Sequence, residues 1–326
     1  MIRRREFITV LGGAAALPHV AGAQQATIPV IGILLATSPD TYENRLREVR
    51  QGLRDVGFIE GENVAIVYRS AEGHYDRLPA LAADLVHRKV AVIFAAPIPA
   101  ALAVKAATAT IPIVFNVAGD PVKLGLVAGL ARPGGNATGV NSFLAELGAK
   151  QLGLLRELLP TATRIGLLVN PANANVEDVT KDVMAAATTT GLQIDVGRAS
   201  DSLEIEAALA TLARNRVDAI LVGSDVFFSS RRVQFSTLMM LYGLPAIFNM
   251  RDFPEVGGLM SYGTNLIETH RQVGIYVGRI LKGANPAELP VIQSTKFEFV
   301  VNLVTARALR LEIPPALLAR ADEVIE

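Results

Sequence analysis

The residues of this sequence that could bind a small molecule stand at or just after the ends of apolar runs. Ten of them form the candidate set: Thr37, Ser38, Ala96, Pro97, Asp120, Asn170, Asn173, Asp225, Arg251 and Tyr262. A carboxylate such as Asp225 can hold an ammonium group, and a guanidinium such as Arg251 can grip a carboxylate with two hydrogen bonds. Small residues followed by a helix leave free backbone N–H groups for an anion, as expected after Ser38 and after Ala96. The chemistry that this set supports is reversible binding of a polar solute.

Three of these residues have an alternative role in local structure. Asp225 could simply cap the helix expected after it. Asp120, which is followed by Pro121, fits a helix N-cap with proline at the first helical position. Asn170 precedes Pro171 and could serve only a turn. The sequence leaves the binding role and the structural role of each residue open.

Arg251 and Tyr262 also have structural alternatives. Arg251 could pair with Asp252 or Glu255 at the surface instead of holding a carboxylate. Tyr262 could pack at a hinge between two domains instead of stacking on a ligand. The sequence leaves the binding role and the structural role of these two residues open as well.

Several kinds of catalytic and metal site are missing from the chain. It contains no cysteine, which excludes disulfides, cysteine nucleophiles and zinc or iron–sulfur sites built on cysteine. His74, His87 and His270 are far apart in the sequence, so no histidine metal cluster is expected. Residues 37–40 lack the glycines of a dinucleotide loop, and residues 223–225 lack the second glycine of a nucleophile elbow. We predict no catalytic residue, no metal and no cofactor.

Length and composition indicate the class of protein. The 326 residues exceed the size at which a single hydrophobic core stops growing, so about two domains are expected. Hydrophobic residues make up 51% of the chain, mainly Ala, Leu, Val and Ile, as is typical of helices packed on buried parallel strands. Basic and acidic residues both number 31, so the chain lacks the basic surplus of a nucleic-acid-binding protein.

The first 23 residues have the features of an export signal. A positive segment, Arg3 to Arg5, precedes a short and weakly hydrophobic stretch over residues 7–17, and Ala21-Gly22-Ala23 fits a cleavage site. The run RREFI looks like a twin-arginine signal, and the alternative is a general secretory signal with an additional arginine. No stretch approaches ~18 uninterrupted apolar residues, so no membrane span is expected. We predict cleavage after Ala23 and a soluble protein in a Gram-negative periplasm.

Strand-like and helix-like stretches alternate along the rest of the chain. Strands are expected at residues 28–36, 63–69, 90–96, 111–118, 164–171, 192–199, 217–224 and 244–250. They are continuously apolar and rich in β-branched residues, as buried parallel strands are. The glycine-rich residues 131–141 interrupt the series and are expected to form the turn between two arrays. Amphipathic helical patterns lie between the strands, among them 173–190, 201–214 and 228–242. The sequence therefore predicts an α/β fold of two doubly wound lobes with a ligand cleft between them.

The C-terminal part is expected to cross back between the lobes. A strand-like stretch at 258–263 is followed by a helical pattern near 265–282, another strand near 296–302 and a terminal helical segment. We predict lobe 1 from residues 27–141 plus part of 264–326, and lobe 2 from residues 142–263 plus the rest of that C-terminal part. Because ligands bind at the carboxyl ends of parallel strands, the candidate residues of both lobes should face the cleft.

Long stretches of the chain resemble one known family. They include GDPVKLGLVAGLARPGGNATG, KGANPAELPV and the C-terminal IPPALLARADEVIE, and together with others they run from near Ile28 to the last residue. They are similar to the ABC-transporter substrate-binding proteins of the tryptophan/tyrosine-type group, a branch of the type 1 periplasmic binding proteins. The resemblance implies two lobes that close on a ligand, three chain crossings at the hinge, and delivery of the ligand to an ABC permease and its ATPase in the inner membrane.

One loop departs from the pattern of that family. The family commonly reads Ala-Gly-Gly-x-Pro where this chain has Ala95-Ala96-Pro97-Ile98-Pro99. A side chain in place of glycine adds a Cβ atom beside the ligand loop that the resemblance implies. The size or identity of the ligand can therefore differ from the aromatic amino acids that characterised relatives bind.

These observations predict a monomeric receptor for a small carboxylated or zwitterionic solute, with an aromatic amino acid as one option. One alternative is a periplasmic sensor that passes its signal to a membrane kinase. Another alternative, from a different class, is an exported α/β enzyme. No nucleic-acid partner and no direct insertion into a membrane are expected.

Overall fold

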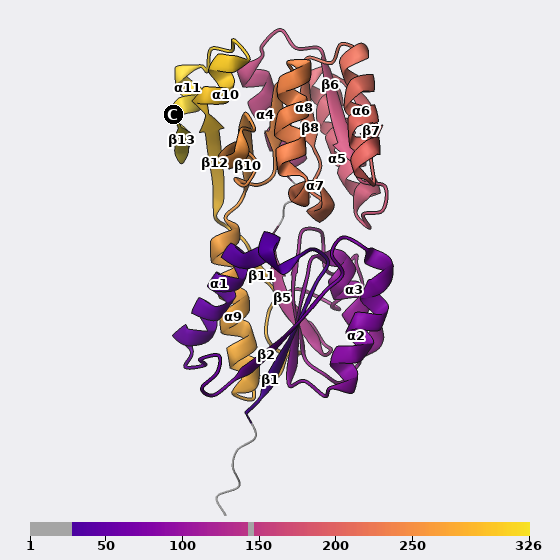
Figure 1. Cartoon of the computed structure of the whole chain (residues 1–326), viewed down its shortest axis with the longest axis vertical. Helices are drawn as coiled ribbons and strands as arrows, with labels where there is room; N and C mark the ends of the chain where they lie inside the picture. The colour runs from indigo at the N-terminus through magenta and orange to yellow at the C-terminus, as the bar shows by residue number, and fades with distance from the viewer. Residues whose placement is uncertain (1–27, 143–146) are drawn as a thin grey trace, which may run out of the picture.

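The computed structural model describes residues 28–142 and 147–326 as two α/β lobes stacked along the long axis of the molecule (Figure 1). This arrangement confirms the predicted fold class. The expected export signal, residues 1–23, lies outside the described residues. Within the described ranges, no helix combines the length and the apolar character that a membrane crossing requires.

Lobe 1 is built on a sheet of six parallel strands in the order β11-β5-β4-β3-β1-β2. Its strands are β1 (Val30–Leu35), β2 (Ala65–Ser70), β3 (Val92–Ala96), β4 (Ile113–Val117), β5 (Ala137–Asn141) and β11 (Ile292–Gln293). Every residue of β3, β4 and β5 is buried, because helices cover both faces of the sheet. This burial explains why the strands read as continuous apolar runs in the sequence.

Two pairs of helices cover the sheet of lobe 1, one pair on each face (Figure 1). The pairs are α1 (Pro39–Asp55) with α9 (Leu266–Leu281), and α2 (Leu78–His87) with α3 (Ile98–Ala107), with the short turn η1 (Tyr75–Arg77) before α2. Helices α1 and α9 approach closely through Gly52 and Gly274, where a Cβ atom would collide with the carbonyl groups of Arg271 and Val49. A helix near the start of the chain is thus packed against one from the C-terminal part.

Lobe 2 is built on a seven-stranded sheet in the order β13-β12-β10-β9-β8-β6-β7, in which only the β10–β12 pairing is antiparallel. Its strands are β6 (Arg164–Val169), β7 (Gln193–Arg198), β8 (Ala219–Val222), β9 (Ala246–Phe248), β10 (Met260–Thr264), β12 (Phe297–Asn302) and β13 (Glu323–Ile325). Its helical segments are α4 (Gly148–Leu158), α5 (Val176–Thr190), α6 (Ser202–Arg214), α7 (Val226–Ser230), α8 (Arg232–Tyr242), η2 (Pro254–Val256), α10 (Leu303–Ala308) and α11 (Pro315–Leu318). One apolar cluster includes residues of α4 and α5, and another includes residues of α6 and α8.

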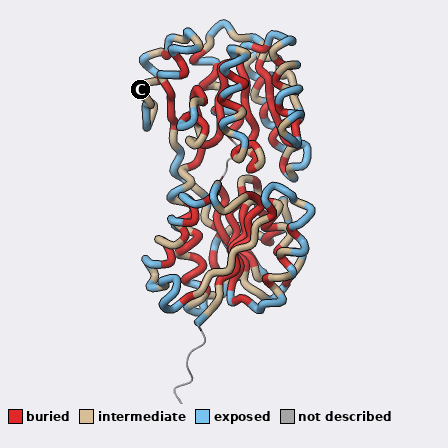
Figure 2. The backbone as a smooth tube through the Cα atoms, viewed as in Figure 1, coloured by how far each residue is buried: buried red, intermediate tan, exposed pale blue. Residues whose placement is uncertain are grey.

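The chain passes between the lobes three times, after β5, after β10 and after β11. The hydroxyl of Thr264 donates a hydrogen bond to the carbonyl of Ser142, which links two of these connections. Figure 2 shows that the strands form a buried centre in each lobe. The carboxyl ends of the parallel strands of both lobes face the boundary between them (Figure 1).

Four local expectations from the sequence are wrong. The glycine-rich residues 131–141 do not form the turn between the lobes but lead into β5, where the absence of a Cβ atom on Gly139 allows close contact with the backbone of Phe115. Asp120 and Pro121 begin a turn and not a helix, and the Asp120 carboxylate accepts hydrogen bonds from the N–H groups of Val122 and Lys123. The helix expected over 228–242 is divided at Arg231 into α7 and α8, and residues 323–325 form a strand.

Candidate functional site

The candidate site lies where the strand ends of the two lobes meet, and its centre is the carboxylate of Asp225. This residue follows β8, is 5% exposed and caps α7. Its Oδ1 accepts hydrogen bonds from the N–H of Phe227 at 2.9 Å and from Nδ2 of Asn170 at 3.0 Å, and its Oδ2 accepts from Nδ2 of Asn173 at 2.8 Å. Burial raises the pKa of the Asp225 carboxyl above its ordinary value, and the hydrogen bonds from both asparagines act against that rise.

The two asparagines are held in place by the loop that follows β6. The Oδ1 of Asn170 accepts a hydrogen bond from the N–H of Ala172 at 2.9 Å, and Nδ2 of Asn173 also donates to the carbonyl of Ser224 at 3.1 Å. Asn170, Asn173 and Asp225, here called the Asp225 cluster, therefore form one hydrogen-bonded unit across the ends of β6 and β8. Among the described residues, Oδ2 of Asp225 accepts the hydrogen bond from Asn173, and a carboxylate oxygen retains capacity for a second donor.

Lobe 1 contacts this region through Tyr75, a residue that the sequence analysis missed. Its hydroxyl is buried and has no hydrogen-bond partner among the described residues. Burial raises the pKa of the Tyr75 hydroxyl, the negative charge of Asp225 raises it further, and the backbone N–H of Phe227 acts against that rise. The adjacent Val226 of lobe 2 is 9% exposed and packs into the apolar cluster of lobe 1. An aromatic residue five positions after β2 was the available signal for Tyr75.

Unpartnered polar atoms are concentrated at this boundary. Among the described residues, six buried side chains have a polar atom without a hydrogen-bond partner: Thr37, Tyr75, Asn175, Asn249, Ser261 and His270. Thr37, Asn175 and Asn249 follow strands β1, β6 and β9, and Tyr75 follows β2, all on the side that faces the other lobe. Since buried polar groups are nearly always paired, these atoms indicate a place for a hydrogen-bonding ligand or for ordered water.

His270 adds an acceptor near the start of α9. Its Nδ1 donates to the carbonyl of Leu266 at 2.7 Å, which leaves Nε2 as the unpartnered atom. Burial, with a smaller contribution from the charge of Arg45, lowers the pKa of His270 to about 3. The ring is therefore neutral at ordinary pH, and Nε2 can accept a hydrogen bond from a ligand or a water.

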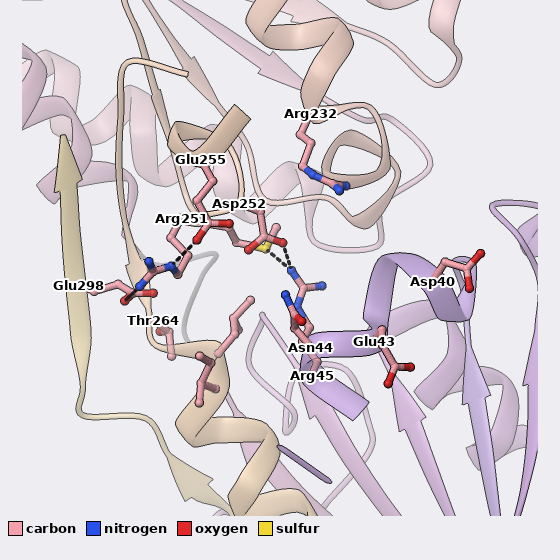
Figure 3. Close-up of a pocket in the computed structure, with 13 residues that line it drawn as sticks. Asp40, Glu43, Asn44, Arg45, Arg232, Arg251, Asp252, Glu255, Thr264 and Glu298 are labelled. Atoms are coloured by element: carbon pink, nitrogen blue, oxygen red, sulfur yellow. Dashed lines mark hydrogen bonds and ion pairs between the residues drawn. The ribbon is translucent and has the colours of Figure 1, made fainter. Parts of the chain in front are cut away.

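A cavity of about 180 Å³ opens between the lobes beside the hinge, and Figure 3 shows the residues that line it. We call it the hinge cavity. Arg45 of α1 donates to the carboxylate of Asp252 in lobe 2 at 2.6 Å, and its guanidinium lies 4.8 Å from the ring centre of Tyr42. The same guanidinium contacts the sulfur of Met250 at 3.4 Å. This pair joins the two lobes and is almost fully buried on the arginine side, where 7% of the side chain is exposed.

The other residues of the candidate set fall into two groups. Ser38 caps α1, buried Ala96 precedes Pro97 at the start of α3, and Asp120 caps its turn, so all of these lie at strand ends that face lobe 2. Arg251 is held by Glu255, Glu298 and Glu323, and Tyr262 stacks on Phe297. Of the partners considered for Arg251 only Glu255 contacts it, since Asp252 pairs with Arg45, and Tyr262 stacks within the sheet of lobe 2.

The described residues contain no group of three or more histidine or acidic side chains arranged to hold a metal ion. The site is instead a set of hydrogen-bond donors and acceptors divided between two lobes. Donors and acceptors placed in this way are suited to hydrogen-bonding a polar molecule.

Comparisons with known proteins agree with this description. The model of the family "ABC transporter substrate binding protein" matches residues 30–325. A tyrosine-binding protein of Clostridioides difficile (strain R20291) is 26% identical over 282 residues, which cover 86% of this chain and 81% of the relative. An ABC domain from Streptococcus pneumonia in complex with L-Trp superimposes with a TM-score of 0.84 at 26% identity, covering 91% of this chain and 99% of that one.

A second solved structure of similar sequence identity has a different score. The ligand-free, open structure of a substrate-binding protein with adhesive properties from Clostridium difficile has the same identity and coverage, 26%, 91% and 99%, but a TM-score of 0.68. The L-Trp complex thus superimposes on this chain with a higher score, 0.84, than this open structure does. The match to the family model over residues 30–325 places the chain in the family of ABC transporter substrate-binding proteins.

Proposed function

We propose that this protein is the solute receptor of an ABC import system and binds a small carboxylated or zwitterionic solute between its lobes. The main support is the set of buried polar atoms without hydrogen-bond partners among the described residues, most of which belong to residues that follow strand ends at the boundary between the lobes. A solute with hydrogen-bonding groups would supply the missing partners, and no covalent step is required. An aromatic amino acid is one option, because one relative is named for tyrosine and another was solved with L-Trp.

In this proposal the Asp225 cluster holds the ammonium group of the solute, through the free capacity of Oδ2. The first turns of α1 and α3, which follow Ser38 and Pro97, offer backbone N–H groups without intrahelical partners to a carboxylate. Tyr75 and Thr37 donate or accept hydrogen bonds on the lobe 1 side. Asp120, Asn170 and Asn173 complete the polar walls of the cleft.

The receptor would work in the periplasm as a monomer and present its closed form to a permease with an ATPase in the inner membrane. Substrate-binding proteins of ABC systems meet their solute outside the cytoplasm, which fits an export signal cleaved after Ala23. N-terminal sequencing of the protein from the periplasm of its host should therefore begin at Gln24. Recovery of the full-length chain from the cytoplasm alone would contradict this part of the proposal.

A thermal-shift screen followed by calorimetric titration tests the proposal. The panel contains aromatic amino acids, other amino acids and simple carboxylates. A solute that binds only the folded protein should raise the free energy of unfolding by ~2.7 kcal/mol at a hundred times its Kd. Failure of all three classes to raise the melting temperature would overturn the proposed solute class.

A further inference from the structure

Among the described residues that line the hinge cavity, one cation has no acidic side chain to neutralise it. Eight of its thirteen lining residues are ionisable, and most of these are already paired within the protein. Arg45 pairs with Asp252. Arg251 pairs with two lining glutamates, and Glu43 pairs with Arg50 outside the cavity. In the described part of the chain, Asp40 and Arg232 are the lining residues left without an ion pair.

Arg232 extends from the start of α8 toward lobe 1 (Figure 3). Its one hydrogen bond runs from Nη1 to the carbonyl of Ser229 at 3.3 Å. A guanidinium carries five N–H donors in a planar fork, so most of the donors of Arg232 are available to a ligand. Asp40 is exposed, and Figure 3 shows its carboxylate directed away from the other labelled side chains, so it does not compete for Arg232.

The short helix α7 relates Arg232 to the Asp225 cluster. Asp225 caps the start of α7, and the carbonyl that Arg232 contacts belongs to Ser229 near its end. At ~1.5 Å per residue these two points are about 6 Å apart along the helix, which is the scale of a small solute. The two ends of α7 thus carry unlike charges at the lobe boundary.

The lining of the hinge cavity is poorly suited to an aromatic ring. Only Met250, Leu266 and Ile267 are apolar among its residues. A ring placed here would remove water from the Arg45–Asp252 pair and from Arg232 without offering them a hydrogen bond, which is unfavourable. An oxyanion, in contrast, would pair with the free donors of Arg232.

We propose that Arg232 binds an anionic group of the solute in the hinge cavity, so that the receptor selects a solute with a carboxylate or similar oxyanion distant from the group held at the Asp225 cluster. This inference rests on the proposed function and specifies its solute class. It makes Arg232 the residue that determines specificity. It also distinguishes the solute of this protein from the aromatic amino acids named for its relatives.

Calorimetric titration with three probes tests the inference: L-glutamate, its uncharged isostere L-glutamine, and L-tyrosine. The wild-type protein should bind L-glutamate about tenfold or more tightly than the other two. Arg232→Gln should abolish that preference. Arg231→Gln is the matched control, because the neighbouring guanidinium lies over the ring of Phe227 at 5.5 Å and does not line the cavity. It should leave the ratio of the dissociation constants unchanged.

The possible outcomes separate the inference from the proposed function. Preference for L-tyrosine, equal binding of L-glutamate and L-glutamine, or an unchanged ratio in Arg232→Gln would overturn the inference while the receptor function stands. If the amino acids do not bind, succinate is titrated next. Succinate binding that Arg232→Gln weakens supports the anion site and removes the ammonium role of Asp225. Failure of every probe to bind overturns the inference, and the wider thermal-shift panel then decides the proposed function.

Discussion

Asp225 has a structural role as a helix cap and a proposed role as a ligand group, and a matched pair of substitutions separates them. Asp225→Ala should weaken solute binding by roughly thirty- to several-thousand-fold, because a buried ammonium would lose its partner. It should also lower the melting temperature, since α7 loses its cap and Asn170 loses an acceptor. Asp201→Ala is the control, because Asp201 caps α6 through the same kind of paired backbone contact at an exposed position.

The control variant should lose about 1 kcal/mol of folding stability and keep its affinity for the solute. Calorimetric titration and a melting curve for each variant measure the two effects. If Asp225→Ala binds as tightly as the wild type while its melting temperature falls, Asp225 is a cap only.

Replacing Tyr75 by phenylalanine should affect the binding of the solute but not the stability of the fold. Its hydroxyl has no partner within the described protein, so Tyr75→Phe should leave the melting temperature unchanged or slightly raised. If the hydroxyl contacts the solute, the Kd should rise about threefold to tenfold. Tyr276→Phe is the matched control, because that hydroxyl donates to the carbonyl of Pro290 at 2.8 Å. The control should be less stable and bind normally, and the opposite pattern would remove Tyr75 from the site.

Site residues could be predicted from the sequence only where their position relative to a strand end determines that they lie at the site. The site residues found in this way, Asn170, Asn173 and Asp225, each come within about four residues of a strand end. Because the carboxyl ends of parallel strands lie at the same edge of a sheet, such residues are brought together. Arg45, Asp252 and His270 were missed because their contacts depend on how two lobes fit together. Arg45 and Asp252 are 207 positions apart in the chain, and no local pattern reports such a pairing.

At the scale of elements, two of the ion pairs in the described part of the chain link lobe 1 to lobe 2 and differ in burial. Arg45 of α1 and Asp252 of the loop after β9 form the buried pair. Lys123, in the turn after β4, and Asp178 of α5 form the second pair at 3.3 Å, with both side chains more than half exposed. A buried pair is costly to break at one partner, whereas an exposed pair contributes little. The buried pair should therefore control how readily the lobes separate.

Asp252→Asn should shift the protein toward an open form and weaken solute binding by about tenfold or more. In the closed form it would leave the buried Arg45 without a charged partner, and a receptor that is closed less often binds less tightly. Asp178→Asn should have no measurable effect on affinity, since it removes the exposed pair only. Titration of both variants measures the difference. Equal affinities in the two variants would show that the buried pair does not bias closure.

Some elements were predictable and others were not, for physical reasons. Buried parallel strands such as β3 and β4 are continuous apolar runs, and such runs predict strands directly from the sequence. Strand β5 was hidden in a glycine-rich stretch, because Gly139 serves close packing against β4 and not a turn. The helix expected after Asp120 does not form, and the turn there ends at Gly125 with a positive φ of 71°. Local capping signals could not distinguish a turn from a helix at that point.

At the scale of the whole molecule, the lobes should close further or more often when the solute binds. The chain has no cysteine, so two spin labels can be introduced without a background. Ala83 on α2 and Ala207 on α6 are exposed positions in lobe 1 and lobe 2. The distance distribution between labels at Ala83→Cys and Ala207→Cys should narrow and shift on addition of saturating solute. A distribution identical with and without a solute known to bind would contradict a closing cleft.

The three chain crossings have a consequence for synthesis on the ribosome. Lobe 1 needs α9 to cover α1 and needs β11 to complete its sheet, so its last parts are made only at residues 266–293. Lobe 2 needs β12 and β13, which end at Ile325. Neither lobe can therefore complete its fold until the final tenth or so of the chain has emerged, although domains of many proteins fold one after another during translation. Any chaperone or export factor that meets the nascent chain encounters two unfinished lobes with exposed strands, and a nonsense codon before Leu266 would leave both of them incomplete.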